Sequence, residues 1–572
     1  MRAPDLYGTI SSQAERVGES SGVSFLGAEG EAHISYPELL AMAAWLRHRV
    51  PLAQDQRPRV LVIAASEPLP TLVAFLAAIG MRAQPLILPP PRALHGLEAF
   101  LSRARSVVDR LARRCAVAVA VQEGLLPPGA HIADVPHVTA PRERAGMGTA
   151  PWAPSSLPAS QEDVAFLQMT SASTGDPKLV AISHENVLAN IVSIRAGLGL
   201  TPADRAVSWL PTHHDMGLVG MILVSLVEGI PLALMSPEFF IRRPSRWLRA
   251  LSDFGGTFTA SPNFGYDHAH RLTSDAELDG VDLRSLRAAV VGAEPVRLAT
   301  LTAFAERFAS LGFQRKSFVP AYGMAESTLA SSMTRPGTVP RYVLVEPRAL
   351  AAGSSVTIVG GGRLGDGVPV PERAVPVFST GRPLEGIELS LRGEDNRAVA
   401  GDGVLGEIVV RGASVSAGYL DPESGHPVPV PGRAFHTGDL GFVQDGDLFI
   451  LERKKQVIIR NGQNYLASLL EEQVARILRL SAHEIMVLDT DIHDPGSKIV
   501  AVAENVKRPE SLVADQVLSL RALEPPIDEL LFAPARVIPR TTSGKKRYHV
   551  CRERLSARSL AIGSAVPLAR TA

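Results

Sequence analysis

Short apolar runs that end in polar loops recur along this chain, and they constrain its fold more than any other feature. Residues 60–64 form a fully apolar run, residues 69–79 have helical character, and residues 84–88 form another apolar run. A run that is apolar throughout is typical of a strand buried on both faces. The order strand, helix, strand is typical of a parallel sheet. The sequence therefore predicts an α/β fold.

Four later runs repeat this arrangement, each ending in a polar loop. They are followed by His213-His214-Asp215, by Ser261-Pro262-Asn263, by Gly292-Ala293-Glu294, and by Tyr322-Gly323-Met324-Ala325-Glu326. In open α/β sheets, ligands bind where loops leave the carboxyl ends of the strands. We therefore expect these four loops to line one shared pocket.

The stretch from Thr170 to Lys178 is a separate candidate for ligand binding. It is rich in hydroxyls, contains a glycine and ends in a lysine, and it lies between an apolar run at residues 164–167 and a helix at residues 187–194. Hydroxyls and backbone N–H groups closed by a lysine suit a polyphosphate. The stretch lacks the spacing of a Walker A loop. An ordinary surface loop between two elements is the competing interpretation.

Length and charge limit the classes of protein that need to be considered. At 572 residues the chain is too long for one hydrophobic core, so we expect at least two domains. Its 58 basic and 58 acidic residues balance, which gives no electrostatic reason to expect nucleic acid or an anionic membrane as partner. The two cysteines, Cys115 and Cys551, suit a reducing cytosol.

The sequence also gives no reason to expect secretion or a membrane span. The first residues lack the apolar core of a signal peptide. Residues 216–235 imitate a membrane span, but they contain Glu228, Gly229 and Pro231. A buried helix followed by a strand is the better interpretation. We therefore expect a cytoplasmic protein with no stable membrane insertion, and the oligomeric state stays open.

The second half of the chain changes character twice. Residues 331–380 contain Gly360-Gly361-Gly362 and several prolines, which predicts an irregular segment or insertion. Residues 387–391 and 406–410 alternate like the strands of a small β subdomain, and residues 441–451 are expected to form a hairpin. The charged residues 452–456 predict a domain boundary. We expect one domain over residues 1–452 and a second over residues 453–572.

Six motifs, in family order, resemble the adenylate-forming superfamily of acyl-CoA synthetases, adenylation domains and luciferases. They are Thr170-Ser171-Ala172-Ser173-Thr174-Gly175-Asp176-Pro177-Lys178, Gly292-Ala293-Glu294-Pro295, Tyr322-Gly323-Met324-Ala325-Glu326-Ser327, Thr437-Gly438-Asp439, Arg453, and Thr542-Ser543-Gly544-Lys545. The resemblance covers nearly the whole chain. It implies a large N-terminal α/β domain of mixed, largely parallel sheets flanked by helices, with a small β subdomain, and then a small mobile α+β C-terminal domain.

Within that superfamily the chain is most similar to the fatty acyl-AMP ligases. Residues 208–218, Ser-Trp-Leu-Pro-Thr-His-His-Asp-Met-Gly-Leu, resemble their signature, and residues 331–380 lie where they carry an insertion. The resemblance implies ATP-dependent activation of a fatty or related acid to acyl-AMP, with release of pyrophosphate. It further implies transfer of the acyl group to the phosphopantetheine thiol of a holo acyl carrier protein, in polyketide, nonribosomal peptide or lipid biosynthesis. In that family the insertion impedes the movement that would let coenzyme A be used.

The same resemblance implies a binding site for ATP. Tyr322 would stack on adenine, Asp439 would accept hydrogen bonds from the ribose, and Arg453 would contact ribose or phosphate. A core tyrosine, a turn aspartate and a linker arginine are the competing interpretations. The implied ATP-binding residues are Thr170, Ser171, Ser173, Thr174, Gly175, Lys178, Gly292, Ala293, Glu294, Tyr322, Gly323, Met324, Ala325, Asp439 and Arg453.

Further residues receive roles in catalysis and substrate binding. Glu326 would bind Mg²⁺, or else serve as a glutamate at a helix start. Lys545 would neutralise charge when the carboxylate attacks the α-phosphate. His214 would face the reacting carboxylate, although a structural histidine is nearly as good an interpretation. The acyl pocket would include His214, Asp215, Met216 and Gly217, and Gln456 would lie at the hinge. Lys546 and Arg547 are expected to be ordinary basic residues of the tail.

Four residues depart from the family pattern and bear on catalytic rate. Ala172 and Leu179 stand where the phosphate loop usually has glycine, which costs backbone freedom. Glu452 replaces a glycine before the arginine, and Gln456 replaces a hinge aspartate. These departures permit a non-catalytic nucleotide-binding scaffold as a rival function. An acyl-CoA synthetase that uses coenzyme A is the other rival. The identity and length of the acyl chain, the carrier protein and the pathway cannot be inferred from these motifs.

Overall fold

The fold is described from a computed structural model of the full chain. The structure describes residues 5–28, 30–53, 56–91, 96–127, 129–144, 160, 163–170, 178–346, 350–460, 463–491, 494, 497–505, 514–540 and 546–568.

Two large sheets form the frame of the described residues. The first has the strand order β18-β14-β13-β12-β11-β9-β10-β1-β2 and the second β23-β22-β8-β7-β4-β3-β5-β6. The first sheet contains β18 (Arg382–Pro383), β14 (Ala330–Met333), β13 (Phe318–Gly323), β12 (Ala288–Val291), β11 (Phe258–Ser261), β9 (Ala206–Ser208), β10 (Leu232–Met235), β1 (Gly22–Gly27) and β2 (Gly30–Ser35). The second contains β23 (Pro427–Val428), β22 (Gly418–Leu420), β8 (Lys178–Ser183), β7 (Val164–Thr170), β4 (Gln84–Ile87), β3 (Arg59–Ala64), β5 (Ala116–Gln122) and β6 (His137–Ala140).

Four parallel neighbours in the first sheet carry the loops that were expected to line one pocket. Strands β9, β11, β12 and β13 pair in that order, each parallel to the next. Their buried, β-branched and small side chains suit a sheet covered on both faces. Because parallel strands end at the same edge, the four loops leave the sheet together, as the sequence predicts.

The second sheet confirms one prediction and corrects another. Strands β3, β4 and β5 pair in parallel, as the alternation of strands and helices predicts. However, the stretch from Thr170 to Lys178 does not lead from a strand into a helix. It connects the antiparallel strands β7 and β8, and helix α5 (His184–Leu198) begins only after β8, capped by Ser183. Leu179 is buried in β8 and so belongs to the strand rather than to the loop.

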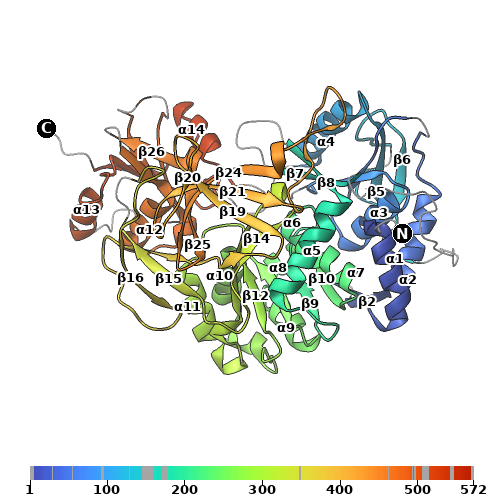
Figure 1. Ribbon diagram of the computed structural model, residues 1–572, viewed down its shortest axis with the longest axis horizontal. Coiled ribbons are helices and arrows are strands. Elements are labelled where there is room, and N and C mark those ends of the chain that lie inside the picture. The colour runs from blue at the N-terminus through green and yellow to red at the C-terminus, as the bar shows by residue number, and fades with distance from the viewer. Residues whose placement is uncertain are drawn as a thin grey trace.

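Helices surround both sheets. Figure 1 places α1 and α2 at one end of the long axis and α12, α13 and α14 at the other. The helices are α1 (Leu6–Val17), α2 (Tyr36–Arg47), α3 (Pro68–Gly80), α4 (Gly96–Ala112), α5 (His184–Leu198), α6 (Asp215–Gly217), α7 (Val224–Glu228), α8 (Pro237–Arg242), α9 (Ser245–Asp253), α10 (Asn263–Leu272), α11 (Leu298–Arg307), α12 (Ala467–Leu478), α13 (Ala514–Arg521) and α14 (Tyr548–Ser556).

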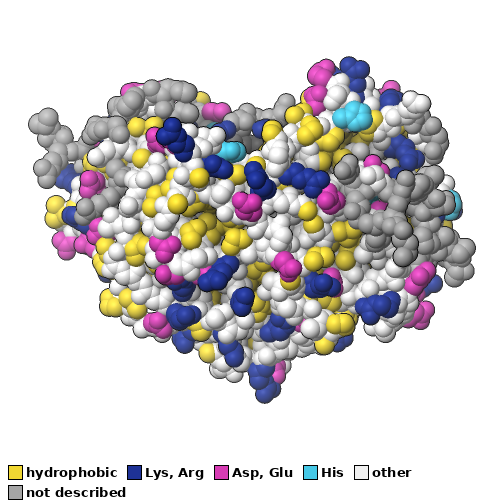
Figure 2. Space-filling view, viewed as in Figure 1, with side chains coloured by type: hydrophobic (Ala, Val, Ile, Leu, Met, Phe, Trp, Pro, Cys, Tyr) yellow, Lys and Arg dark blue, Asp and Glu magenta, His cyan; other side chains and the backbone are white. Residues whose placement is uncertain are grey.

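The apolar stretch at residues 216–235 is a buried helix followed by a strand, as predicted. Helix α6 continues through the π-helical turn η2 (Leu218–Leu223) into α7, and β10 follows. Among the described residues, no helix combines the length and the apolar character needed to cross a bilayer. On the face shown in Figure 2, basic and acidic side chains are interspersed.

The segment at residues 331–380 is more regular than predicted. Its described residues form a three-stranded antiparallel sheet of β15 (Arg341–Val345) between β16 (Ile358–Arg363) and β17 (Val375–Phe378). Gly360-Gly361-Gly362, which predicted irregular structure, lies in β16. A Cβ on Gly361 would lie 2.6 Å from the Tyr342 carbonyl oxygen, so the glycines permit close strand approach there.

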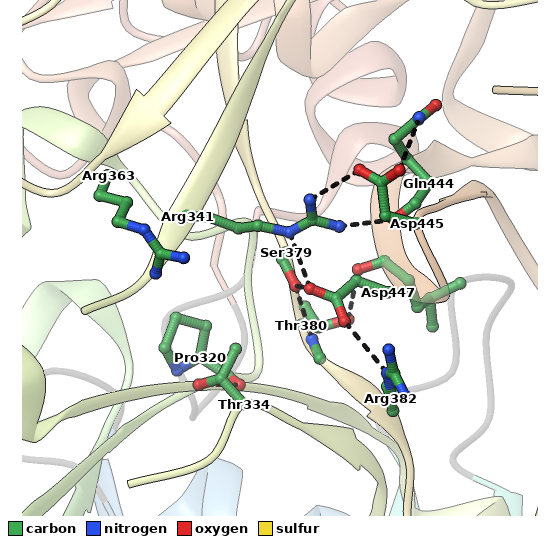
Figure 3. A network of polar contacts seen from close by, with 12 residues as sticks. Pro320, Thr334, Arg341, Arg363, Ser379, Thr380, Arg382, Gln444, Asp445 and Asp447 are labelled. Carbon is green, nitrogen blue, oxygen red and sulfur yellow. Dashed lines mark hydrogen bonds and ion pairs between the residues drawn. The ribbon is translucent and has the colours of Figure 1, made fainter. Parts of the chain in front are cut away.

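An arginine fastens this small sheet to the neighbouring β subdomain (Figure 3). The Arg341 guanidinium lies 2.8 Å from Asp447 Oδ2 and 2.9 Å from Asp445 Oδ2. The Ser379 hydroxyl also donates to Asp447 Oδ2, at 2.9 Å. The subdomain contains β20 (Ala398–Val399), β19 (Ile387–Arg392), β21 (Gly406–Gly412), β24 (Ala434–Gln444) and β25 (Asp447–Arg453).

Most buried residues after β25 build two hydrophobic cores of their own, whereas Leu466 and Leu469 pack into a core with Leu440 and Phe449 of the β subdomain. One core packs α12 and β28 to β30 together, and a second packs the same sheet against α14. The strands are β26 (Val457–Arg460), β27 (Gln463–Leu466), β28 (Ile485–Asp489), β29 (Ile499–Glu504), β30 (Glu529–Ala533) and β31 (Ser564–Pro567).

Helix α12 also contacts the segment at residues 331–380. The Arg476 guanidinium donates to the Pro371 carbonyl at 3.0 Å and to the Ala374 carbonyl at 2.8 Å. Gln473 Nε2 donates to the Arg373 carbonyl at 3.2 Å. The small antiparallel sheet therefore touches chain on both sides of residue 453.

Candidate active site

Three polar side chains converge at the edge where the parallel strands of the first sheet end. The Tyr322 hydroxyl, at the end of β13, donates to Asp439 Oδ2 at 2.8 Å. Arg453 Nε lies 3.0 Å from Asp439 Oδ1. Tyr322 and Asp439 are buried, whereas about half of the Arg453 side chain is exposed. The family resemblance implies ATP-binding roles for all three residues, and the fold brings them together.

The β subdomain holds Asp439 opposite Arg453. Strands β24 and β25 are antiparallel, and Asp439 pairs with Arg453 in their register. The Asp439 backbone N–H donates to Thr437 Oγ1, and the Thr437 hydroxyl donates to the Ile408 carbonyl. The Asp439 carboxylate raises the pKa of Arg453, and burial raises the pKa of Tyr322 well above its usual value. The cluster therefore contains a fixed anion flanked by a neutral hydroxyl and a cation.

Backbone geometry brings the neighbouring loops close together. A Cβ on Gly292 would lie 3.2 Å from the Ala321 carbonyl oxygen and 3.9 Å from Met216 Sδ. Residues that follow β9 and β12 therefore meet the end of β13 at Gly292. Ala293 has a φ of +69°, which an L-residue adopts at a cost. A Cβ on Gly323 would lie 1.7 Å from the Leu329 carbonyl oxygen, so only glycine fits there.

Glu294 and the residues after Gly323 take up structural positions around this edge. Glu294 Oε1 accepts a hydrogen bond from the Phe264 backbone N–H at 3.2 Å. Met324 and Ala325 are both buried. The backbone of these residues, rather than their side chains, is the part that can line a nucleotide pocket.

Glu326 is linked to the end of the predicted phosphate loop through a tyrosine. The Tyr419 hydroxyl donates to Glu326 Oε1 at 2.6 Å. Lys178 Nζ lies 4.7 Å from the centre of the Tyr419 ring. Burial, followed by the Glu326 carboxylate, raises the pKa of Tyr419. Strand β22 supplies Tyr419 because it pairs with β8, next to Val180. At the base of the same hairpin the Thr170 hydroxyl donates to the Lys178 carbonyl at 3.4 Å.

Tyr419 is the residue of this site that the sequence did not reveal. Gly418, Tyr419 and Leu420 form a strand of three residues with no recognisable motif around them. Its hydrogen bond to Glu326 links two residues that are 93 positions apart in the sequence. We find no signal in the sequence that would have identified it.

The histidine turn forms its own pair and bridges the two sheets. His214 Nδ1 lies 2.6 Å from Asp215 Oδ1, and Asp215 Oδ1 also accepts from the Met216 backbone N–H. His214 immediately precedes α6. Gln168 Nε2, on β7 of the second sheet, donates to the His213 carbonyl at 2.7 Å. A Cβ on Gly217 would lie 2.2 Å from the Pro211 carbonyl oxygen, so this turn has room only for glycine.

Several predicted residues lie outside the described residues. They are Ser171, Ala172, Ser173, Thr174, Gly175 and Lys545. Their roles remain those implied by the resemblance.

The predicted hinge region contains a buried carboxylate. Gln456 lies half-buried in the 3-10 turn η8 (Lys454–Gln456). Glu452 is buried, and its carboxylate accepts from the Ser468 backbone N–H at 2.6 Å and from the Arg453 backbone N–H at 3.0 Å. Ser468 lies in the first turn of α12, so Glu452 binds the N-terminus of that helix.

Lys546 corrects the prediction that it is an ordinary basic residue of the tail. Its side chain is only 8% exposed, and its ammonium donates to Glu471 Oε2 at 2.5 Å and to the Ala482 and Ile485 carbonyls. A basic run in a sequence does not distinguish a solvated lysine from one that is paired in a core.

Known proteins match this chain over most of its length. The profile of the family described as AMP-binding enzyme matches residues 12–420. The long-chain-fatty-acid–AMP ligase FadD26 of Mycobacterium bovis is 34% identical over 419 residues, which are 68% of this chain and 69% of the relative. FadD28 of Mycobacterium tuberculosis, also a long-chain-fatty-acid–AMP ligase, is 34% identical over 427 residues, with 68% and 70% covered.

Solved structures agree. A structure from work on fatty acyl-adenylate ligases of E. coli and L. pneumophila superposes with a TM-score of 0.80 at 25% identity, and covers 97% of this chain and 98% of its own. The fatty acyl-adenylate ligase of L. pneumophila in complex with acyl adenylate and pyrophosphate gives a TM-score of 0.71 at 25% identity, with 99% and 98% covered.

Proposed function

Because this chain belongs to the family of AMP-binding enzymes and is an adenylate-forming ligase of the fatty acyl-AMP type, we propose the following reaction for it. In the first step a fatty or related carboxylic acid reacts with ATP to give acyl-AMP and pyrophosphate. In the second step the acyl group passes to the phosphopantetheine thiol of an acyl carrier protein. The observation that carries this proposal is the cluster of Tyr322, Asp439 and Arg453 at the edge where the loops after β9, β12 and β13 meet.

In the first step a carboxylate oxygen of the acid attacks the α-phosphorus, and the bond to the leaving pyrophosphate breaks. Asp439 suits the ribose hydroxyls because an ionised carboxylate accepts two hydrogen bonds well. Arg453 and Lys178 suit the phosphates. The approach of two anions requires fixed positive charge, and we assign that role to Lys545 and the positioning of the acid to His214. His214, Asp215, Met216 and Gly217 support an acyl pocket because Met216 lies beside Gly292.

Glu326 fits the magnesium ion that the family uses with ATP. Mg²⁺ is usually held by one or two carboxylates together with phosphate oxygens and water. The described residues contain no group of three or more His, Cys, Asp or Glu that would hold a metal without a substrate. A single carboxylate whose Oε1 is oriented by Tyr419 suits an ion shared with the phosphates. When bound, the ion would neutralise phosphate charge.

The second step requires the parts of the chain on either side of residue 453 to move. The thiol sulfur attacks the acyl carbon, AMP leaves, and the thiol proton passes to solvent. We propose that residues 1–452 form the adenylation domain and that residues 453–572 form a domain that rotates between the steps. The separate cores after β25 support this division. The contacts of Arg476 and Gln473 support a restraint by the segment at residues 331–380 on that rotation.

Two assays test the proposal. Pyrophosphate–ATP exchange should depend on the added fatty acid, and Lys545→Ala should remove most of it. Normal exchange by Lys545→Ala would contradict the role of this lysine, and no exchange by the wild type would contradict the first step.

The acceptor is tested separately. Thioester formation should be faster with holo acyl carrier protein than with coenzyme A. Equal or faster reaction with coenzyme A would assign the protein to the acyl-CoA synthetases. Mass spectrometry of the adenylate formed from a mixture of acids would identify the acyl chain.

A further inference from the structure

A lysine beside the proposed catalytic lysine is held inside the C-terminal part of the chain. The side chain of Lys546 is 8% exposed. Its ammonium donates to Glu471 Oε2 on α12 at 2.5 Å, to the Ala482 carbonyl at 2.8 Å and to the Ile485 carbonyl. Burial lowers the pKa of Lys546, and the Glu471 carboxylate opposes that shift. An ammonium has three protons to donate, and these three acceptors match them.

The partner carboxylate is itself bonded on both oxygens. Glu471 Oε1 accepts from the Tyr548 hydroxyl at 2.7 Å and from the Val487 backbone N–H at 3.1 Å. Glu471 is 3% exposed. Its position is therefore determined by α12, β28 and α14 together. A fully bonded buried pair of this kind resists displacement, because breaking it leaves a buried charge unpaired.

The backbone on either side of residues 541–545 is also fixed. Arg540 and Lys546 form an antiparallel bridge, and the Arg547 N–H donates to the Pro539 carbonyl at 2.8 Å. The Arg540 guanidinium donates to the His483 carbonyl at 2.7 Å and to Glu504 Oε2 at 2.8 Å. The two basic side chains that flank residues 541–545 are thus both engaged by the protein.

The residues that anchor Lys546 lie beside helix α10, next to the loop after β12. The His483 ring centre is 6.0 Å from that of Phe264, whose N–H donates to Glu294. Burial, followed by the charges of Arg540 and Arg297, lowers the pKa of His483 to about 2. Arg297, at the start of α11, therefore also lies near His483. The elements that hold Lys546 therefore face the loop after β12.

We propose that Lys546 and Glu471 are positioning residues for the adenylate-forming step. They fix the position of the residue that directly follows Lys545 in the chain, on elements that face the loop after β12. Lys545 directly precedes Lys546 in the sequence. Because adjacent Cα atoms are about 3.8 Å apart, a shift of Lys546 passes to its neighbour. The inference rests on the proposed function. The alternative is a buried ion pair that contributes only to folding.

The two half-reactions distinguish these possibilities. In Lys546→Met, pyrophosphate–ATP exchange should fall about 10- to 100-fold in kcat, while the KM for ATP stays within about threefold because the nucleotide contacts are untouched. Transfer from a chemically prepared acyl adenylate to holo acyl carrier protein should keep its rate, because it does not involve displacement of pyrophosphate. That second rate also reports whether the variant is folded.

Matched variants keep the test decisive. Tyr548→Phe removes one hydroxyl and preserves the volume, so it should give a smaller fall, confined to the same step, even if Lys546→Met folds poorly. Arg552→Met is the control, because Arg552 and Asp489 form another buried pair in the same part of the chain at 2.5 Å, between α14 and β28. It should lower stability without a selective loss of the first step.

The outcomes separate this inference from the proposed function. If both half-reactions fall together in Lys546→Met and Tyr548→Phe, or neither changes, the pair has no positioning role and the inference is overturned. If the wild type itself shows no acid-dependent exchange, the proposed function fails and the inference falls with it. A selective loss of the first step in both variants supports the inference.

Discussion

At the scale of single residues, the bond between Tyr322 and Asp439 joins two positions that the family resemblance treats as independent contacts to ATP. The hydroxyl donates to a buried carboxylate at 2.8 Å. Such a bond orients the carboxylate and also reduces the cost of burying its charge. The residue expected to stack on adenine thus also positions the residue expected to bind ribose.

Tyr322→Phe should therefore weaken ATP binding. A hydrogen bond to a charged group contributes about 1.5–3 kcal/mol, so the KM for ATP in pyrophosphate exchange should rise roughly tenfold or more. Tyr36→Phe is a suitable control, because it removes a buried tyrosine hydroxyl that donates to the Ile230 carbonyl, far from the site. An unchanged KM in Tyr322→Phe would show that Arg453 alone keeps Asp439 in place.

Glu452 is a residue whose charge state bears on stability. Burial raises its pKa from 4.5 to about 7, and the nearby Glu471 carboxylate adds to the shift. Between these two pH values the folded protein binds a proton that the unfolded chain releases. The free energy of unfolding should therefore fall as pH rises through this window, by on the order of 3 kcal/mol at most from this group.

Glu452→Gln should flatten that dependence. Urea unfolding of both proteins at pH 5 and pH 8 measures it, and the difference between the two pH values should be smaller in the variant. Glu388→Gln changes an exposed glutamate on β19 and provides the control. The same slope in Glu452→Gln as in the wild type would mean that this carboxyl has an ordinary pKa.

At the scale of elements, helix α12 connects the segment at residues 331–380 to the region after the hinge. Its Arg476 binds the Pro371 and Ala374 carbonyls, while its first turn binds Glu452. Arg341 ties the other side of the same segment to the β24–β25 hairpin (Figure 3). The three-stranded sheet is therefore held on both sides of the proposed rotation point.

Arg476→Met should release one of these attachments. It keeps most of the aliphatic stem and removes the donors, so the Pro371 and Ala374 carbonyl oxygens turn to water. Hydrogen exchange in α12 should become faster, and the rate of thioester formation with coenzyme A relative to carrier protein should rise. Arg479→Met, on the αL residue that ends α12, is the matched control. If hydrogen exchange becomes faster but the ratio of coenzyme A to carrier-protein reaction stays the same, the segment does not control the choice of acceptor.

At the scale of the whole molecule, the proposed site draws on both large sheets and on the β subdomain. Lys178 and Tyr419 belong to the second sheet, Tyr322 to the first, and Asp439 to the subdomain. A ligand that contacts all of them stabilises their arrangement, because it binds the folded state and not the unfolded chain.

Mg-ATP should therefore raise the melting temperature of the protein. At about 100 times its Kd, a ligand adds roughly 2.7 kcal/mol to the free energy of unfolding, which corresponds to a shift of several degrees. Asp439→Ala should lose most of the shift, whereas Asp395→Ala, at an exposed aspartate of the same subdomain, should keep it. A full shift in Asp439→Ala would place the nucleotide elsewhere.

The sequence by itself determined the type and order of the main elements and the family. Periodicity, capping residues and glycine loops are local signals, so β3–α3–β4, the buried stretch at residues 216–235 and the parallel run from β9 to β13 were predictable. The roles assigned to Tyr322, Asp439 and Arg453 followed from motifs whose order survives in the chain.

Only the tertiary structure decided which side chains meet. Tyr419 reaches Glu326 across 93 positions, Lys546 reaches Glu471 across 75, and Glu452 reaches α12 across 16. The sheet within residues 331–380 likewise depends on pairing between strands rather than on local propensity. Burial and pairing are properties of the packed molecule, and residues that look like solvated charges in the sequence become part of its interior because packing removes water from both partners at once.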